Sequence, residues 1–455
     1  MLILILKILF NSDLRKNAIV LGAGFKGMMA SLKLSQKGFN VTLIEASKKF
    51  GGVLNSPIWD QMHIDLGCHL FFNQDDELTQ EILKIIDHKF NPVPPNYASS
   101  LNKQISDDIA IPNFESLNEL EKKEIYKGLL NPKTYYKKIT SLHQVFVNRF
   151  GDKSVEWIDR CLQKSHLIKS DQLDPLAKNL LPYERIRIFD IDKALKLKEE
   201  KWYDDRIAVP RKENTLEKRE TSKFSFFEFY PLEGGLKLFC ENLHQILLSR
   251  GVNIRLGLPI ESISFKNNFY LTSNEELFKC DYLYWAIPQN FLPKLFGLNL
   301  NLEPFIHSVA LVLYYFTVDK KSVSNYTYLQ NYDLDNYCFR FSVQSNYAEN
   351  NIPENRALLC CEIPTKLGSP IWETPENFSG QIWDEAKKMG IVKNNYRSMK
   401  SLKVPKAFML PKKGYSDNFQ NVKKQIQFEK LLGIKSWDFS KNEILKDIDN
   451  ELKLI

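Results

Sequence analysis

The sequence lacks the features that mark several classes of protein. After the first ten residues, no apolar run is long enough to span a bilayer. No block of like charges stands out, and the net charge is only +7 over 455 residues, so we expect no nucleic-acid partner. An anionic substrate or a peripheral contact with a membrane is compatible with this balance but is not indicated by it. The composition predicts an ordinary globular, cytoplasmic protein and leaves its oligomeric state open.

Cysteine is scarce, and its spacing suits neither metal ions nor disulfides. The seven cysteines are scattered and no C-x-x-C occurs. Cys360 and Cys361 are neighbours on a predicted strand, where successive side chains point to opposite faces. His63 and His69, with Asp65 between them, could mimic a metal site, which we do not expect. No Ser-His-Asp spacing is convincing either. A reducing compartment fits this pattern best.

The first ten residues, Met1–Phe10, are strongly apolar but are interrupted by Lys7. A signal peptide would need a basic start and a cleavage site with small residues, and the basic start is absent. We expect a peripheral strand or helix, or an over-extended start of the reading frame. The alternative is a loose anchor on a membrane surface.

The most informative segment begins directly afterwards. Ala18–Leu21 is a short apolar run suited to a buried strand, and Gly22–Gly27 follows it with the pattern G-x-G-x-x-G. Met28–Gln36 then reads as a helix, and Val41–Ile44 as a second strand that ends in Glu45. Strand, glycine turn, helix, strand and terminal acid together predict a dinucleotide-binding βαβ unit.

Each part of this unit has a physical role. Gly22 permits the tight turn, Gly24 lets the backbone approach a pyrophosphate, and Gly27 lets helix and strand pack closely. The helix N-terminus supplies N–H groups for phosphates, and Glu45 can accept hydrogen bonds from a ribose diol. The candidate cofactor-binding residues here are Gly22, Gly24, Phe25, Lys26, Gly27 and Glu45.

The residues that follow carry a family resemblance. Gly51-Gly52 come next, and then Ile64–Phe72, which reads I-D-L-G-C-H-L-F-F. This order resembles the flavoprotein superfamily of amine oxidases, protoporphyrinogen oxidases and phytoene desaturases, to which UDP-galactopyranose mutases are related. The resemblance implies FAD as the cofactor. It also implies that Gly51 and Gly52 lie near the phosphates and flavin, and that the segment with Asp65, Gly67 and His69 approaches the isoalloxazine ring.

A second block of the chain resembles the same superfamily. The turn Phe229–Gly235 leads into a predicted amphipathic helix, Leu236–Arg250, and a strand at Val252–Leu256. Cys280–Pro288 matches the strand and turn that follow in relatives. In the family, main-chain groups at the position of Ile260 meet the adenine end of FAD. The resemblance therefore implies that the chain leaves the nucleotide domain near residue 95 and returns near residue 225.

These motifs predict an α/β fold: a discontinuous Rossmann-like FAD-binding domain and a second substrate domain that mixes helices with an antiparallel sheet. We assign residues 1–95, 225–300 and 405–455 to the first, and 96–224 and 301–404 to the second. The second domain is predicted to contain helices at 117–129, 134–150, 154–165 and 379–388, no strands between 97 and 224, a charged connector at 193–223, and strands at 309–318, 337–343 and 357–363.

The tail departs from the family. Relatives introduce their last helix with a glycine-rich turn and an Arg or Asp near the flavin. Here Gly433 and Asp438 are the stand-ins, before a predicted helix at Asn442–Leu454. The second glycine and the arginine are absent, which bears on flavin affinity more than on the fold.

Three functions remain open. The first is an FAD-dependent oxidoreductase that takes a hydride equivalent from a C–N or C–C bond of a small organic substrate. The second is a non-redox flavoenzyme resembling UDP-galactopyranose mutase, although no clear arginine pair for a diphosphate is evident; turnover of UDP-galactose under reducing conditions would identify it. The third is a degenerate binding protein with a flavin fold, which would fail to retain FAD. No catalytic residue can be named from the sequence.

Overall fold

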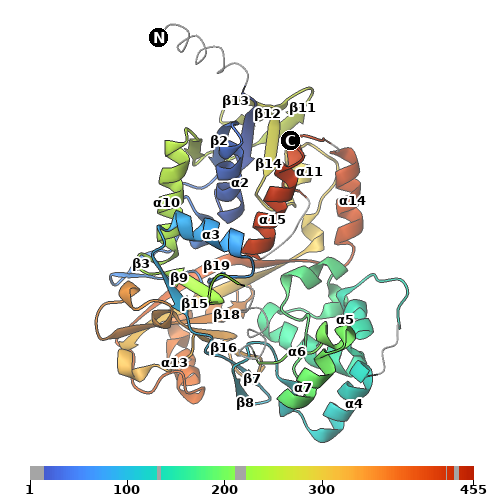
Figure 1. The fold of residues 1–455 in the computed structure, drawn as a ribbon, viewed down its shortest axis with the longest axis vertical. Helices are drawn as coiled ribbons and strands as arrows, with labels where there is room; N and C mark the ends of the chain where they lie inside the picture. Colours follow the sequence, from blue (N-terminus) through green and yellow to red (C-terminus); the bar gives the residue numbers. More distant parts are fainter. Residues whose placement is uncertain (1–14, 131–134, 211–221, 427, 435–439) are drawn as a thin grey trace.

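The structure, a computed structural model, describes residues 15–130, 135–210, 222–426, 428–434 and 440–455. Figure 1 shows an α/β body at the top, a large sheet at the lower left and a group of helices at the lower right. Met1–Phe10, residues 211–221 of the predicted charged connector 193–223, and Asp438 lie outside the described residues, and so do the predictions made for them. The α/β class and the Rossmann-like unit are confirmed, whereas the exact division into two domains stays a prediction.

A five-stranded sheet of parallel neighbours lies at the centre of the upper body, in the order β10-β2-β1-β14-β20. Alternate residues face opposite sides: Val20 and Leu43 pack beneath helices, while Ile19 and Leu283 face the other layer. Its strands are β1 (Asn17–Leu21), β2 (Asn40–Glu45), β10 (Asn253–Leu256), β14 (Tyr282–Trp285) and β20 (Leu431–Leu432).

Both faces of this sheet are covered, as its nearly continuous apolar strands require. One face carries α2 (Phe25–Gln36), flanked by α10 (Gly235–Ser249) and α15 (Lys441–Leu452), with α3 (Asp76–Ile85) in the same apolar cluster. The elements on the other face are β11 (Ser262–Phe265), β12 (Phe269–Ser273), β13 (Glu276–Cys280), α11 (Phe291–Leu295) and α14 (Tyr415–Gln425).

The large sheet at the lower left has seven strands, in the order β19-β15-β18-β17-β16-β7-β8. Its pairs are antiparallel except for β16 with β7. One face packs on α12 (Pro370–Glu373) and α13 (Ser379–Lys388), and the other on Met62 and Ile64. The strands are β7 (Tyr97–Leu101), β8 (Gln104–Asp107), β15 (Ile306–Asp319), β16 (Tyr328–Asn331), β17 (Arg340–Val343), β18 (Arg356–Thr365) and β19 (Ser398–Pro411).

The helices at the lower right form an apolar cluster of their own. They are α4 (Glu119–Leu130), α5 (Leu142–Phe150), α6 (Asp152–His166), α7 (Ile191–Lys198) and α8 (Lys201–Asp204). Two further small sheets are formed by β3 (Ile58–Trp59) with β4 (Met62–His63), and by β9 (Glu228–Pro231) between β5 (Phe71–Phe72) and β6 (Phe90–Val93).

Three predictions for the second region are corrected. The absence of strands between 97 and 224 is wrong, because β7 and β8 lie there; β7 is buried at every position, so it shows no alternation of apolar and polar residues. The helix predicted from residue 134 begins only at Leu142, since the Asn148 side chain accepts hydrogen bonds from the backbone of Tyr135 and Tyr136 and holds that segment as a loop. The charged connector contains α7 and α8.

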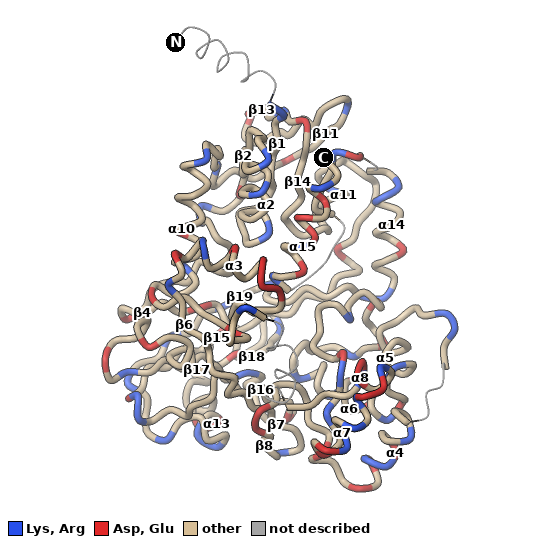
Figure 2. The backbone as a smooth tube through the Cα atoms, viewed as in Figure 1, with Lys and Arg blue, Asp and Glu red and all other residues tan. Residues whose placement is uncertain are grey.

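The described surface carries both signs of charge, interspersed along the chain as Figure 2 shows. The expectation that no nucleic acid is bound stays a prediction. Among the described residues, the structure contains no helix whose length and apolar content would let it cross a membrane. A peripheral membrane contact stays a prediction.

Candidate functional site

The glycine turn between β1 and α2 is as tight as its three glycines suggest. Gly22 has a φ of +98°, and its N–H donates to the carbonyl of Ile44 at 2.7 Å. A Cβ on Gly27 would lie 1.8 Å from the carbonyl oxygen of Gly22, so only glycine permits this approach of helix to strand. The turn is therefore closed on the side that faces the sheet.

The opposite side of the turn is open. Gly24 is the N-cap of α2 with a φ of −78°, and a Cβ there would meet no atom within 4 Å. No side chain caps this end of α2 in the described chain, and its first turn holds no acidic residue. In contrast, Asp75, Ser141 and Ser440 cap α3, α5 and α15. The uncapped N–H groups of α2 leave a place for an anion.

Gly51 and Gly52 pack against this turn. The N–H of Gly51 donates to the carbonyl of Ala23 at 2.8 Å, and a Cβ on Gly52 would lie 3.1 Å from the Cα of Gly24. Both residues have positive φ angles, 101° and 57°. The fold thus places Gly51 and Gly52 beside the Gly22–Gly27 turn, from which more than twenty positions separate them in the sequence.

Glu45 lies beside the same turn, at the carboxyl end of β2. Its two carboxylate oxygens accept hydrogen bonds from the N–H groups of Ala23 and Ser47, each at 2.8 Å. Its carbonyl accepts from Leu258 at 3.0 Å, which places the segment leading to Ile260 alongside. Ile260 is half-buried against the apolar cluster beneath the sheet. Ligands of parallel sheets bind at this carboxyl edge.

The two variable positions of the motif have structural contacts. The ring of Phe25 stacks on Phe239 at 5.8 Å between centroids. The ammonium of Lys26 donates to the carbonyl of Gly433 at 2.5 Å, which ties α2 to the end of β20. Gly433 has a φ of +80°, and a Cβ there would lie 2.3 Å from the Trp285 carbonyl oxygen. The glycine of the atypical tail is therefore required by packing.

Asp65 is fully buried, and its polar atoms bond within the protein. Its carboxylate accepts hydrogen bonds from the hydroxyls of Ser56 and, at 2.5 Å, Tyr230. Its carbonyl accepts from the hydroxyl of Tyr315 at 2.6 Å. Burial raises the pKa of Asp65 to about 6, although these hydrogen bonds act in the opposite direction. Asp65 thus anchors its loop to β9 and β15.

Replacing Asp65 with asparagine is expected to remove a pH dependence of stability. Because the pKa of this carboxyl is about 6 in the folded chain and ordinarily 3.8, its contribution to stability is fully present below about pH 4 and is lost as pH rises through 6. The unfolding free energy of the wild type relative to Asp65→Asn should fall by about 2 kcal/mol between pH 4 and 7. Urea titrations at these pH values measure it, and a constant difference would contradict it.

The next residues are fixed by a buried ion pair. Arg340 donates from Nε and Nη2 to the two carboxylate oxygens of Glu362, both at 2.7 Å. Glu362 also accepts from the N–H of Cys68 at 3.0 Å, and a Cβ on Gly67 would lie 3.2 Å from its carboxylate carbon. The Gln344 side chain donates to the Gly67 carbonyl at 3.1 Å. The large sheet therefore determines the path of the 65–69 loop.

His69 combines a backbone bond with a place in a cavity. Its Nε2 donates to the Leu66 carbonyl at 3.2 Å, which leaves Nδ1 as an acceptor. Burial, together with the nearby charges of Lys441 and Arg340, lowers its pKa to about 3, so the ring is neutral. His69 can therefore accept a hydrogen bond from a ligand but is a weak base.

A cavity of about 810 Å³ lies where the three regions meet. His69 and Lys441 line it from the α/β body, Arg340 from the large sheet, and His166 and Tyr183 from the helical region. Burial lowers the pKa of His166 to about 3, so this second imidazole is also neutral. Among the described residues, no cluster of three or more metal-ligating side chains occurs. Much of the cavity wall is apolar.

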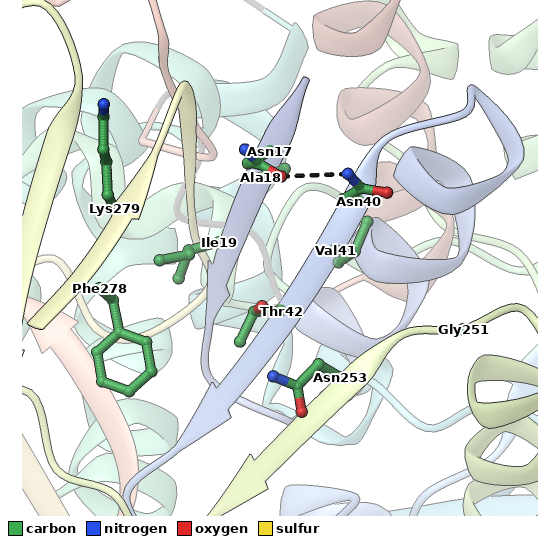
Figure 3. A pocket seen from close by; sticks show the side chains of 10 residues that line it. All are labelled: Asn17, Ala18, Ile19, Asn40, Val41, Thr42, Gly251, Asn253, Phe278 and Lys279. Atoms are coloured by element: carbon green, nitrogen blue, oxygen red, sulfur yellow. Dashed lines mark hydrogen bonds between the residues drawn. The ribbon is translucent and has the colours of Figure 1, made fainter. Parts of the chain in front are cut away.

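A smaller cavity lies at the opposite edge of the parallel sheet. Its volume is about 300 Å³. Figure 3 shows its lining residues at the amino ends of β1, β2 and β10. There Asn40 donates from its side chain to Asn17 at 3.3 Å. Because parallel sheets bind ligands at their carboxyl ends, this cavity is not part of the candidate site.

Several residues of the site escaped the sequence analysis. The partners of Asp65 and the Arg340–Glu362 pair lie far away in the sequence, and no local pattern marks them. Lys441 carried a partial signal, since it immediately precedes the helix predicted from Asn442. The tail lacks the arginine that relatives carry before this helix, and no sequence pattern indicated that Lys441 lies in the site.

Comparisons with known proteins agree with this arrangement. A family model described as an NAD(P)-binding Rossmann-like domain matches residues 20–86. A carotenoid phi-ring synthase from Chlorobaculum tepidum is 38% identical over 63 residues, which is 13% of this chain and 10% of that protein. The match thus spans about a tenth of the relative's length.

Two solved structures cover nearly the whole chain. A reduced UDP-galactopyranose mutase has a TM-score of 0.71 at 15% identity, covering 97% of this chain and 96% of its own. A protein described as a protoporphyrinogen oxidase, from Exiguobacterium sp. 255-15, has a TM-score of 0.69 at 16% identity, covering 96% and 99%. The predicted resemblance is confirmed at the level of the fold: residues 20–86 match a Rossmann-like domain, and the chain has the fold that this UDP-galactopyranose mutase and this protoporphyrinogen oxidase share.

Proposed function

We propose that the chain binds FAD and acts as a flavin-dependent oxidoreductase that takes a hydride equivalent from a C–N or C–C bond of a small organic substrate. The observation that carries the proposal is the uncapped N-terminus of α2, framed by Gly24 on one side and Gly51-Gly52 on the other. An anion placed there would complete the hydrogen bonding of the helix end. The pyrophosphate of a dinucleotide fits this requirement.

The residues for the rest of FAD follow from the same edge of the sheet. The carboxylate oxygens of Glu45 each hold one backbone N–H, and their remaining lone pairs can accept ribose hydroxyls. The segment of Ile260 adjoins Glu45, which suits the adenine end. His69 lines the large cavity, part of which suits the flavin end. FAD, when bound, supplies the acceptor for the hydride equivalent.

The protein's own part is to orient the substrate and exclude water. The cavity walls are largely aliphatic and aromatic, so an apolar substrate skeleton gains free energy by entering them. His69 and His166 are neutral; His69 can accept a hydrogen bond from a substrate donor, and neither ring abstracts a proton efficiently. Because FAD would accept the hydride equivalent and the protein would only orient the substrate, no conspicuous catalytic pair is needed in the sequence.

A second candidate function is favoured by one observation. Arg185 and Arg340 both line the large cavity, and the sequence alone had revealed no such arginine pair. Two guanidinium groups facing one cavity suit a diphosphate, as in a sugar nucleotide. Conversion of UDP-galactose by the dithionite-reduced protein would support a mutase; its absence together with turnover of another substrate would favour the oxidoreductase.

Gly24→Glu is expected to abolish FAD binding while leaving the fold intact. The new side chain would extend from the open side of the turn and place a carboxylate where the pyrophosphate is proposed to lie. The purified wild type should show flavin absorbance in near-stoichiometric amounts, and the variant none, with unchanged circular dichroism. Air reoxidation of the reduced wild type would then separate an oxidase from a dehydrogenase.

Gly380→Glu is the matched control. Gly380 lies in α13, and a Cβ there also meets no atom within 4 Å, so both variants add the same charge to an open position. It should retain FAD as the wild type does. A yellow Gly24→Glu protein would refute the assigned phosphate site. A wild type that stays colourless after incubation with FAD would favour a degenerate binding protein.

A further inference from the structure

We propose that the large cavity takes an anion with an apolar body, and that Lys441 and Arg340 hold its anionic head; this rests on the proposed function in treating the occupant as the substrate. The proposal bears on whether the substrate is oxidised at a C–N or a C–C bond. A charged amine is disfavoured in such a site, and an apolar carbon skeleton is favoured. Of the two bonds named in the proposed function, the cavity therefore favours C–C over C–N, in a substrate whose head is anchored as an anion.

Lys441 is the first reason. It is the first residue of α15, and its ammonium donates to the Leu70 carbonyl at 3.0 Å and lies 5.3 Å from the ring centroid of Phe71. It forms no ion pair with any carboxylate in the described chain. Burial lowers the pKa of this ammonium group to about 8. A buried ammonium without a counter-ion is costly. An anion from the cavity would supply the missing partner.

Arg340 is the second reason. Its Nε and Nη2 are engaged by Glu362, whereas its Nη1 has no hydrogen-bond partner among the described residues. The bidentate pair fixes the plane of the guanidinium, so the remaining donor edge is pre-organised. Arg340 and Lys441 come from the large sheet and the α/β body and line the same cavity. Together they offer donors from two sides.

The rest of the lining supports an apolar-bodied anion. The lining adds three cationic side chains, Lys178, Arg185 and Lys406, against two carboxylates, Asp108 and Glu184, so positive charge predominates among the described lining residues. Most of the other lining residues are apolar. Its larger members are Ile109, Leu181, Tyr183, Phe339, Phe408 and Leu410. A small hydrophilic anion would leave this surface without a partner.

The head-group preference can be measured on the wild-type holoprotein by isothermal titration calorimetry. The probes share a ten-carbon chain and differ at one end: decanoate, decyl phosphate, decan-1-ol and decylamine. Decanoate or decyl phosphate should bind at least tenfold more tightly than the alcohol and the amine, and whichever is tighter identifies a carboxylate or a phosphate as the head. Equal affinities, or a preference for the amine, would overturn the proposal.

UDP-galactose tests the apolar body. It carries a diphosphate without a hydrocarbon chain, so it should bind at least tenfold more weakly than the better decyl anion. Tighter binding of UDP-galactose would overturn the proposed substrate class. It would also favour the mutase reading of the site.

Lys441→Gln tests the assigned residue. The variant should lose at least tenfold in affinity for the decyl anion and less than twofold for decan-1-ol, and Lys441→Arg should restore the anion preference. Lys453→Gln is the matched control, because Lys453 is exposed at the far end of the same helix. An unchanged preference in Lys441→Gln would exclude the lysine. If that variant does not fold, the head-group series on the wild type still decides the proposal.

The flavin spectrum separates this inference from the proposed function. A yellow protein without a preference for anions keeps the oxidoreductase proposal and refutes the substrate class. A colourless protein that binds decanoate as described refutes the cofactor proposal and keeps the anion site.

Discussion

Gly27→Ala is expected to lower the free energy of unfolding by about 3 kcal/mol or more. The added methyl carbon would lie 1.8 Å from the Gly22 carbonyl oxygen and 3.2 Å from the Ala286 side chain. Neither β1 nor α2 can move away, because β1 is paired on both sides and α2 is packed between sheet and helices. Urea denaturation followed by circular dichroism measures the effect.

Gly24→Ala is the control from the same turn. Its methyl group meets no atom within 4 Å, and the φ of −78° is ordinary for alanine, so the cost should stay below about 1 kcal/mol. Similar losses in the two variants would mean that the helix does not approach the strand as closely as described.

Arg340→Met is expected to cost about 3–5 kcal/mol, since it leaves the buried carboxylate of Glu362 without its cation. The side chain of Glu362 is only 1% exposed, and besides Arg340 its carboxylate accepts a hydrogen bond from the backbone N–H of Cys68. The loss should be accompanied by faster proteolysis around the 65–69 loop, which this pair holds against the large sheet. Chemical denaturation and limited proteolysis check the two effects.

Arg255→Met provides the comparison. Arg255 is also paired with a carboxylate, since its Nη2 donates to both oxygens of Glu276 at 2.9 Å, but the two side chains are 36% and 48% exposed. Exposed pairs contribute little, so this variant should lose less than about 1 kcal/mol. If the exposed pair costs as much as the buried one, desolvation is not what makes Arg340 important.

The sequence predicted best what is local. The β1–α2–β2 unit could be recognised because glycines, apolar runs and a terminal acid occur in fixed order within thirty residues. The helices with strong periodicity were found almost to the residue, as at Ser379–Lys388. In contrast, β7 gave no signal, since small polar residues occupy a strand that is buried at every position.

The candidate site was predictable only as a set of segments. The motif residues Gly24, Gly52 and Glu45 do come together, but nothing in the sequence shows that Asp65 is held by Tyr230 or that Glu362 reaches Cys68. These contacts join residues 165 and 294 positions apart. Long-range pairs of this kind depend on how whole layers pack, and a single sequence carries no pattern for them.

The strand order of the parallel sheet has a consequence for how the protein is made. β1 and β2 emerge from the ribosome before the other strands of this sheet, yet the second neighbour of β1 is β14, and β14 in turn pairs with β20, which comes later still. During synthesis the first βαβ unit therefore exposes an unpaired apolar strand edge until most of the chain has been made. Non-local pairing of this kind slows folding, so the nascent protein is a natural client for chaperones that shield strand edges.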